Sequence, residues 1–534
     1  MKIRKLTTIC LFALGTMALT TSCNDYLDTL PDDRAELNSV DKIKSVLTTG
    51  ISNKLPNMLM YMSSDDVTDN GKAYGYTPAM QDMYLFKDVN TRGNDDPYRV
   101  WNGTYYSIGV ANQALAALDK LEKKLGDNAE TKSLRAEALL ERAYGLFSLS
   151  NAFCMAYDAT KADTYLGLPY PKVADEEVAS RGSLKELYAN IDADIEAALP
   201  LIDDGYLAVP KYHFNRKAAY AFAARFNLYY GNNDKAIKYA TEAIGVDPTA
   251  NLRQMDNYKS LAGLKDICNH YISSSEKANL MLQTAYSFMG RIQEYDRYSH
   301  NITITKYETF WAVAPWVEGM NPYSDKTCLY EAKRMFGGAY NVNLPKMQEI
   351  FEVTDKINQT GFPHIVNVAF STDETLLVRA EAEILKKDYA AAVRDMNYWI
   401  GAHCAVSNKV FGGDGTAKRP TLTEQGIVDY MKQLAESVVT PKTDRERSIK
   451  KVLHPQGFTV EAGKQTSFIQ LLLHMRRIET WKTGLRFMDL KRYGIEYTHF
   501  RAGEDPIVFK AGDKRGALQL PEDVLKAGLE ANPR

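Results

Sequence analysis

The sequence is poor in cysteine, and its few cysteines form no metal-binding or cross-linking pattern. It has 6 in 534 residues, and no two stand in a C-x-x-C pair. Apart from Cys10 and Cys23 near the N-terminus, the cysteines lie far apart, at Cys154, Cys268, Cys328 and Cys404. Zinc sites and disulfide frameworks use characteristic cysteine spacings. The sequence therefore predicts neither, and we expect no bound metal.

Surplus charge and long apolar runs are also missing. The 65 Lys and Arg residues are balanced by 67 Asp and Glu residues, which leaves a net charge of -2. Nucleic-acid binding draws on a surplus of basic residues, so this balance argues against it. Beyond the N-terminus, no apolar run reaches the roughly 20 residues that a membrane-spanning helix needs. Membrane contact is therefore expected only through an anchor.

The motifs of common hydrolases are absent as well. Neither H-E-x-x-H nor G-x-S-x-G occurs, and the 8 histidines are scattered singly. Ser274 and Lys277 make an S-x-x-K match, but the S-D-N motif that should accompany it is absent. Carboxylates are so abundant that a glycosidase pair could be chosen at many places, so their number carries no information. The sequence predicts a protein that is not an enzyme and uses no cofactor. A surface hydrolase is a further alternative, which would have to release product from a glycan.

The N-terminus has the pattern of a lipoprotein signal. Basic residues within the first five positions precede an uncharged apolar stretch at residues 9–19, which is too short to span a membrane. The small residue Ser22 then precedes Cys23. This pattern predicts that residues 1–22 are a signal peptide and that Cys23, as the new N-terminus, carries acyl chains that hold the protein on a membrane. The alternative is an ordinary cleaved signal with a free cysteine nearby.

Helical spacing of apolar residues dominates much of the remaining chain. One helix is predicted from its N-cap Ser39 to about residue 54, and a second begins near Pro97. A third is predicted over residues 130–154 and is expected to pair antiparallel with the second. No linker rich in Pro, Ser or Gly divides residues 23–534, so we predict a single domain.

Two segments share the spacing of small residues that is typical of tetratricopeptide repeats. Ala224 and Ala236 are separated by the same interval as Ala380 and Ala392. Small side chains at these positions let the two helices of a hairpin cross closely. We therefore predict a mainly α fold, a tetratricopeptide-like scaffold of helix hairpins that stack into one hydrophobic seam. The helical units are predicted near residues 39–156, 183–248 and 373–401.

The helical pattern weakens between these units, over residues 250–370, where Tyr, Asn, Gly and Ser become frequent. Short runs such as Asn301–Thr305 resemble strands. The pattern predicts a large loop-rich insertion with minor β structure, and this is where we expect a ligand to bind. A second irregular stretch, residues 403–420, is interpreted as a surface turn.

Aromatic residues are plentiful, with 33 Tyr and 5 Trp. Carbohydrate sites combine flat rings, which stack on the C–H faces of sugars, with polar side chains that pair with hydroxyl groups. The irregular segment supplies this mixture outside any helical stripe. The opposing interpretation is that Trp311 and Trp316 are core rings, since tryptophan is usually well buried. The candidate ligand-binding residues of this segment are Arg291, Tyr295, Asp296, Tyr298, Asn301, Trp311, Trp316 and Tyr323.

A second candidate surface lies earlier in the chain. Tyr74 and Tyr76 follow the polar stretch Asp65–Gly71. We interpret this stretch as a solvated turn beside two rings. Calcium binding is a weaker alternative, because the stretch lacks the alternating ligands and the distal Glu of an EF-hand loop.

A motif near the C-terminus resembles the hallmark of the SusD/RagB family, which is roughly R-R-x-E followed by E-G-x-R-x-x-D-L-x-R-x-G. The matching positions are Arg477, Glu479, Gly484, Arg486, Asp489, Leu490, Arg492 and Gly494. Thr480 and Thr483 depart from the pattern. Residues 23–28, 376–385 and 520–533 also resemble the family. The arginines and carboxylates of the motif are expected to form buried bidentate ion pairs that hold the terminal helix on the scaffold.

The resemblance implies a SusD-like fold over residues 23–534 and a lipoprotein on the outer surface of the outer membrane. It also implies that the protein binds an oligosaccharide or polysaccharide, performs no bond chemistry, and delivers its ligand to a SusC-like TonB-dependent transporter. One alternative is a tetratricopeptide-type scaffold that binds only protein partners, which predicts buried rings at residues 291–325. Another is a surface lipoprotein that binds peptides.

Overall fold

The computed structural model describes residues 37–126, 128–173, 180–291, 296–318, 326–331, 336–337, 342–408 and 415–534. The predicted signal peptide, Cys23, Tyr295, Tyr323 and part of the predicted turn at 403–420 lie outside these residues. The helices are α2 (Val40–Leu47), α3 (Asn57–Met62), α4 (Pro78–Tyr84), α5 (Pro97–Leu125), α6 (Ala129–Phe153), α7 (Leu184–Ala198), α8 (Arg216–Tyr230), α9 (Asn233–Ile244), α10 (Leu264–Tyr271), α11 (Ile302–Glu308), α12 (Thr372–Leu385), α13 (Tyr389–His403), α14 (Glu424–Gln433), α15 (Lys464–Glu479), α16 (Leu485–Arg492) and α17 (Glu522–Lys526). The strands are β1 (Thr68–Asp69), β2 (Asn279–Ala285), β3 (Tyr298–Ser299), β4 (Phe336–Gly337), β5 (Val342–Asn343), β6 (Ile350–Asp355), β7 (Thr360–Ser371), β8 (Tyr497–Arg501) and β9 (Glu504–Phe509).

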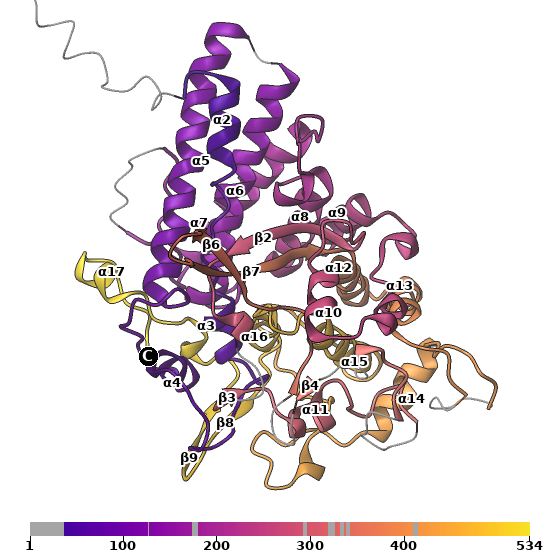
Figure 1. The fold of residues 1–534 in the computed structure, drawn as a ribbon. Coiled ribbons are helices and arrows are strands. Elements are labelled where there is room, and N and C mark those ends of the chain that lie inside the picture. The colour runs from indigo at the N-terminus through magenta and orange to yellow at the C-terminus, as the bar shows by residue number, and fades with distance from the viewer. Residues whose placement is uncertain are drawn as a thin grey trace, which may run out of the picture.

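Helices α5 and α6 form a long hairpin, against which α2 packs (Figure 1). Asn128 starts α6 by accepting hydrogen bonds from the backbone N–H groups of Glu130 and Thr131, each at 3.0 Å. Ser39 caps α2 as predicted. That helix ends at Leu47, earlier than the sequence predicted. The α5–α6 hairpin and its position agree with the prediction.

The two segments with the repeat spacing are helix hairpins, α8–α9 and α12–α13. Ala224, Ala236, Ala380 and Ala392 are all completely buried, as close crossing of paired helices requires. Gly231 ends α8 with φ of 87°, a left-handed conformation that glycine adopts without a steric cost. Helix α12 also packs against α9 and α15, so the hairpins stack. The predicted mainly α, tetratricopeptide-like fold is confirmed.

The irregular middle of the chain contributes a three-stranded antiparallel sheet in the order β2-β7-β6. Its central strand β7 leads directly into α12. The strand predicted at Asn301–Thr305 is wrong. Residues 302–308 are the helix α11, because the side chain of Asn301 caps it by accepting a hydrogen bond from the Ile304 N–H at 3.0 Å.

The main hydrophobic core joins the two ends of the described chain. One cluster of buried side chains runs from Leu55 to Leu520 and includes residues of α6, α8, α12, α15 and α16. Helix α16 packs against α3 (Figure 1). The β8–β9 hairpin lies beside β1. Residues near position 490 are thereby placed next to residues near position 65. None of the described helices combines the length and the apolar character needed to cross a bilayer.

Candidate functional site

The C-terminal motif forms a buried network of ion pairs that fastens the start of strand β1. The Nε of Arg477 donates to Asp66 Oδ1 at 2.7 Å, and its Nη2 donates to the backbone oxygen of Asp65 at 2.7 Å. Arg486 forms a bidentate pair with the Asp65 carboxylate, with both distances 2.8 Å. All four residues are buried. Helices α15 and α16 therefore fix the backbone just before β1.

The same motif also holds α16 on the helical scaffold. Arg476 makes a bidentate pair with Asp489, with both distances 3.0 Å. Arg492 and the hydroxyl of Tyr493 both donate to Glu381 of α12, at 2.8 Å and 2.7 Å. Bidentate, charge-assisted hydrogen bonds fix the orientation of both partners. These are the structural ion pairs that the sequence motif predicted.

Asp65 and Asp66 are not part of a solvated turn, and that interpretation is wrong for these two residues. Burial raises the pKa of Asp65, but Arg477 and Arg486 outweigh it and hold the pKa well below its usual range. The pKa of Glu308, which also contacts Arg477, is lowered in the same way. Burial raises it, but the positive charges of Lys451 and Arg477 outweigh burial and hold the pKa at about 2. The network is therefore a charged cluster of buried carboxylates, arginines and a lysine.

Beyond the buried ion pairs at Asp65 and Asp66, strand β1 lies beside the segment that begins at residue 296. Strand β1 pairs antiparallel with β3, and Asp69 forms a bidentate ion pair with Arg297 at 2.8 Å and 2.7 Å. The backbone N–H of Arg297 donates to the Gly75 oxygen at 2.9 Å. The Asn301 amide donates to the Asn70 side-chain oxygen at 3.1 Å. We call the surface made by Asn70, Tyr74, Tyr76, Asp296, Arg297 and Asn301 the β1–β3 patch.

The patch presents one well-exposed ring. Tyr76 is 44% exposed, and the Arg297 guanidinium lies 5.2 Å from its ring centroid. Tyr298 packs edge-on against Tyr76, with the ring centroids 5.7 Å apart, but is itself buried. The proposal that Tyr298 offers a ring to a ligand is therefore wrong: it supports Tyr76 from beneath. The structure thus brings Tyr74, Tyr76, Asp296 and Asn301, which are predicted from two separate segments, onto one surface.

A family model described as "Starch-binding associating with outer membrane" matches residues 25–228. A putative sugar-binding protein of Bacteroides vulgatus is 18% identical, with a TM-score of 0.62 over 93% of this chain and 98% of that one. A SusD superfamily protein of Bacteroides thetaiotaomicron is 16% identical, with a TM-score of 0.59 over 93% and 100% of the two chains. The chain has a SusD-like fold, and its residues 25–228 match a SusD-like family model. A laminarin-binding SusD-like protein is also similar, at 16% identity and a TM-score of 0.52 over 92% of this chain and 97% of that one. Comparison with curated proteins finds no match.

Trp311, Trp316 and Arg291, which the sequence also predicted as ligand-binding residues, are not among the residues of the patch. Trp316 is buried, stacked on His474 with centroids 5.6 Å apart, so its interpretation as a core ring is the correct one. Trp311, which follows α11, is only partly buried against the core. Arg291 is exposed, but it pairs with Glu349 and lies over the Phe288 ring.

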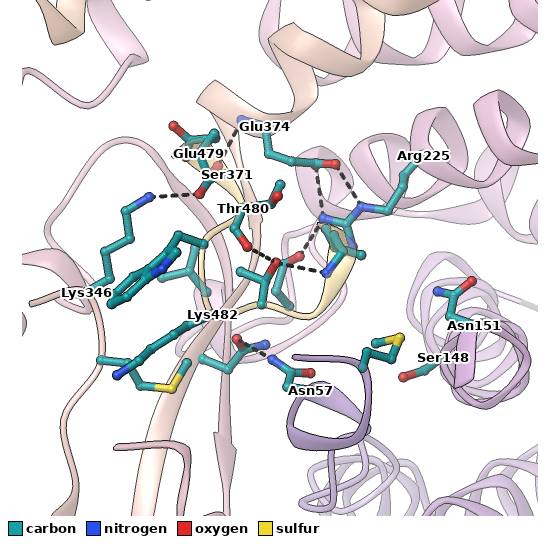
Figure 2. Close-up of a pocket in the computed structure, with 18 of the residues that line it drawn as sticks. Asn57, Ser148, Asn151, Arg225, Lys346, Ser371, Glu374, Glu479, Thr480 and Lys482 are labelled. Atoms are coloured by element: carbon teal, nitrogen blue, oxygen red, sulfur yellow. Dashed lines mark hydrogen bonds and ion pairs between the residues drawn. The ribbon is translucent and has the colours of Figure 1, made fainter. Parts of the chain in front are cut away.

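A pocket lies between α8, α12, β7 and the segment after α15 (Figure 2). Arg225 and Glu374 form a bidentate pair at its wall, at 3.0 Å and 2.9 Å, and Lys346 donates to the Glu479 backbone oxygen at 2.8 Å. Its volume is about 70 Å³. That space suits a few water molecules, which satisfy buried polar groups, and is too small for an oligosaccharide.

Asp373, His403 and Glu479 form the one group of potential metal ligands among the described residues. The two nitrogens of His403 bond to Glu331 and Asp373, the latter at 3.0 Å. Burial lowers the pKa of His403, but the surrounding carboxylates outweigh it and raise the pKa to about 10. A protonated imidazole already supplies positive charge to this cluster, which we interpret as a structural ion-pair group.

Sequence reasoning named most of the patch but missed what organises it. Asp69 and Arg297 are 228 positions apart, and no spacing rule links them. The only signal in the sequence was that the segments around both residues are rich in Tyr, Asn and Asp. The contribution of Arg477 and Arg486 to the base of β1 was likewise hidden, because the motif reveals the arginines but not their distant partners.

Proposed function

We propose that this protein is a surface lipoprotein that binds an oligosaccharide or polysaccharide at the β1–β3 patch and passes it to a SusC-like TonB-dependent transporter. The observation that carries the proposal is the exposed Tyr76 ring, supported by Tyr298 and Arg297 and surrounded by amides and a carboxylate. The protein acts by binding alone, with no bond made or broken.

The chemistry of the patch suits a sugar. The face of a tyrosine ring attracts the C–H groups on the apolar side of a pyranose, while the sugar hydroxyls need donors and acceptors in fixed directions. Asn70, Asn301 and Asp296 provide both kinds of group beside the ring. The Asp69–Arg297 pair holds the two segments together, so little ordering is needed when the ligand arrives.

Relatives support the class of ligand. The matching family is described as starch-binding, and similar structures include a putative sugar-binding protein and a laminarin-binding protein. The description of the matching family also mentions association with the outer membrane. A lipid on Cys23 would place the folded chain there without a spanning helix.

Separate experiments test glycan binding and the lipid anchor. In native gels that contain starch, laminarin or another polysaccharide, migration of the purified mature protein should be slowed by at least one polymer. No retardation by any class of polysaccharide would refute glycan binding. For the anchor, labelled palmitate should enter the wild-type protein in cells and be absent from a Cys23→Ala variant. Labelling that persists in the variant would refute the anchor at Cys23.

The proposed transfer of the ligand to a transporter needs its own test. Affinity purification of the anchored protein from membranes should recover a SusC-like transporter. The competing function, a scaffold that binds only proteins, is favoured by the burial of Tyr298 and Trp316. It predicts that a protein partner is recovered while no polysaccharide slows migration. A protein that both binds glycan and recovers the transporter would exclude this alternative.

A further inference from the structure

A cleft that is lined by exposed aromatic rings lies between α2, α5, the short helix η2 (Pro210–Tyr212) and strand β2. Its volume is about 610 Å³, far above that of the pocket in Figure 2 and within the range of roughly 300–1,000 Å³ that is usual for ligand sites. We call it the tyrosine cleft. Its lining includes Asn53, Tyr106, Tyr212, His213, Thr284 and Tyr286.

The rings of the cleft are open to solvent. Tyr106 is 71% exposed and Tyr212 is 37% exposed. Tyr286 is partly exposed and meets Phe362 of β7 edge-on, with centroids 5.9 Å apart. Phe362 is 56% exposed and extends the aromatic surface beyond the cleft. Large rings that remain exposed together on a folded protein commonly mark a binding surface.

The cleft carries no carboxylate, lysine or arginine among its lining residues. Its ionisable group besides the tyrosines is His213, whose Nδ1 lies 2.7 Å from Glu137 Oε1; this hydrogen bond raises the pKa of His213. A charge on the imidazole is thus balanced by Glu137. The exposed side chains of Asn53 and Thr284 make no hydrogen bond to the described part of the chain. They are available to hydroxyl groups of a ligand.

The cleft is held in shape before any ligand binds. Tyr106 stands on α5, which packs along α6. The floor is tied to the loop after α2, because the Gln283 amide donates to the Ser52 oxygen at 2.6 Å and the Tyr286 N–H donates to the Asn53 oxygen at 3.0 Å. A preformed site avoids the entropy cost of ordering its side chains on binding.

We infer that the tyrosine cleft is a second carbohydrate subsite, which takes pyranose units of an uncharged polysaccharide. The lining residues carry no formal charge other than that of a protonated His213, which Glu137 balances, so the cleft suits a neutral sugar better than an acidic one. Lys54, outside the lining, has its Nζ 4.8 Å from the Tyr286 ring centroid and donates a hydrogen bond to Asn94 at 2.9 Å. The cleft shares no residue with the β1–β3 patch. The two lie at different places in the fold, since α2 and α5 are in the upper part of Figure 1, β2 is near its middle, and β3 and β8 are near its base. The inference rests on the proposed function and deepens it: one long chain can engage both sites.

The test compares variants of the full mature protein. Tyr106→Ala/Tyr212→Ala removes the two exposed rings of the cleft, and Tyr76→Ala removes the ring of the patch. Phe351→Ala is the matched control, because Phe351 is an exposed ring outside both sites. Affinity for starch, laminarin and the other neutral polysaccharides that slow the wild type is measured in native gels over a range of polymer concentrations. Urea midpoints verify that each variant is folded.

Each outcome decides the inference. We expect the double variant to bind a neutral polymer at least about tenfold more weakly, since linked sites add avidity, while the control matches the wild type. If the double variant binds every polymer as the wild type does and Tyr76→Ala does not, the second subsite is refuted and the proposed function stands. If the wild type binds no polysaccharide, both fail. If the double variant keeps glycan binding but loses a protein partner, the cleft is a protein-docking surface and the inference is overturned.

Discussion

Replacing Arg477 with methionine removes the guanidinium that pairs with Asp66 at the base of β1. Both residues are almost completely buried, and the Nε of Arg477 lies 2.7 Å from Asp66 Oδ1. Burial raises the pKa of Asp66, Arg477 opposes that shift, and Asp65 adds to it. Asp65 and Glu308, which also contact Arg477, keep other partners in the variant: Arg486 for Asp65, and Arg447 and Lys451 for Glu308. The loss therefore falls chiefly on Asp66.

The size of the effect follows from the protonation of that carboxyl. Without Arg477, buried Asp66 takes up a proton in the folded state. In the unfolded chain its pKa is near 3.8, and protonation above that pH costs about 1.4 kcal/mol per pH unit. The cost is at most about 4 kcal/mol at pH 7 and about 2 kcal/mol at pH 5, and the deficit relative to the wild type is smaller because the pKa of Asp66 is already raised there. The first value agrees with the roughly 3–5 kcal/mol lost when a buried pair is broken.

The assay is urea unfolding of the mature protein, followed by circular dichroism at pH 5 and pH 7. A raised folded-state pKa makes stability fall as pH rises, so the deficit of Arg477→Met must be larger at pH 7. Arg92→Met is the control, because Arg92 is exposed and its pair with Asp523 contributes at most about 1 kcal/mol. Arg477→Met/Asp66→Asn should recover most of the loss, since the neutral amide needs no counterion. A deficit equal at both pH values, or no recovery in the double variant, would refute the reasoning.

Two further perturbations probe other parts of the fold. The stability of the wild-type protein should fall as the pH is lowered from 4.5 to about 2. The carboxyl of Glu308 has a depressed pKa in the folded state, so it stabilises the fold only while it is ionised. Urea midpoints that do not fall between pH 6 and pH 3 would contradict this. Ala380→Leu should lower the free energy of unfolding by about 1–3 kcal/mol or more, since Ala380 is fully buried where α12 packs on its neighbours. Ala390→Leu, at an exposed position, serves as the control. Equal urea midpoints for the two variants would contradict the proposed packing.

The helical part of the fold could be predicted because its signals are local. The interval between Ala224 and Ala236 reports a hairpin crossing, and Ser39 reports a helix start, since each depends on residues within a few turns. The strand expected at Asn301–Thr305 failed for a local reason too: the cap that Asn301 provides outweighed the β-branched side chains that follow it.

The binding surface was harder to predict because burial depends on distant neighbours. Tyr298 and Trp316 come from the same aromatic-rich segment as Trp311, yet His474 and Trp399 cover Trp316 while Trp311 stays partly exposed. Asp66 and Arg477 are 411 positions apart, so a turn at Asp65–Gly71 was a reasonable interpretation of the local sequence. The tyrosine cleft joins four separate segments, and none of them alone suggests a site.

Titration calorimetry of Tyr76 variants tests the central claim most directly, using whichever polysaccharide slows the wild-type protein. Tyr76→Ala should weaken binding about 10- to 100-fold, or about 1.4–2.8 kcal/mol, while Tyr76→Phe, which keeps the ring, stays within about threefold of the wild type. Because Tyr76 is 44% exposed, Tyr76→Ala should lower the urea midpoint only slightly and Tyr76→Phe should leave it unchanged. Wild-type affinity in Tyr76→Ala would contradict the assignment of glycan binding to the β1–β3 patch.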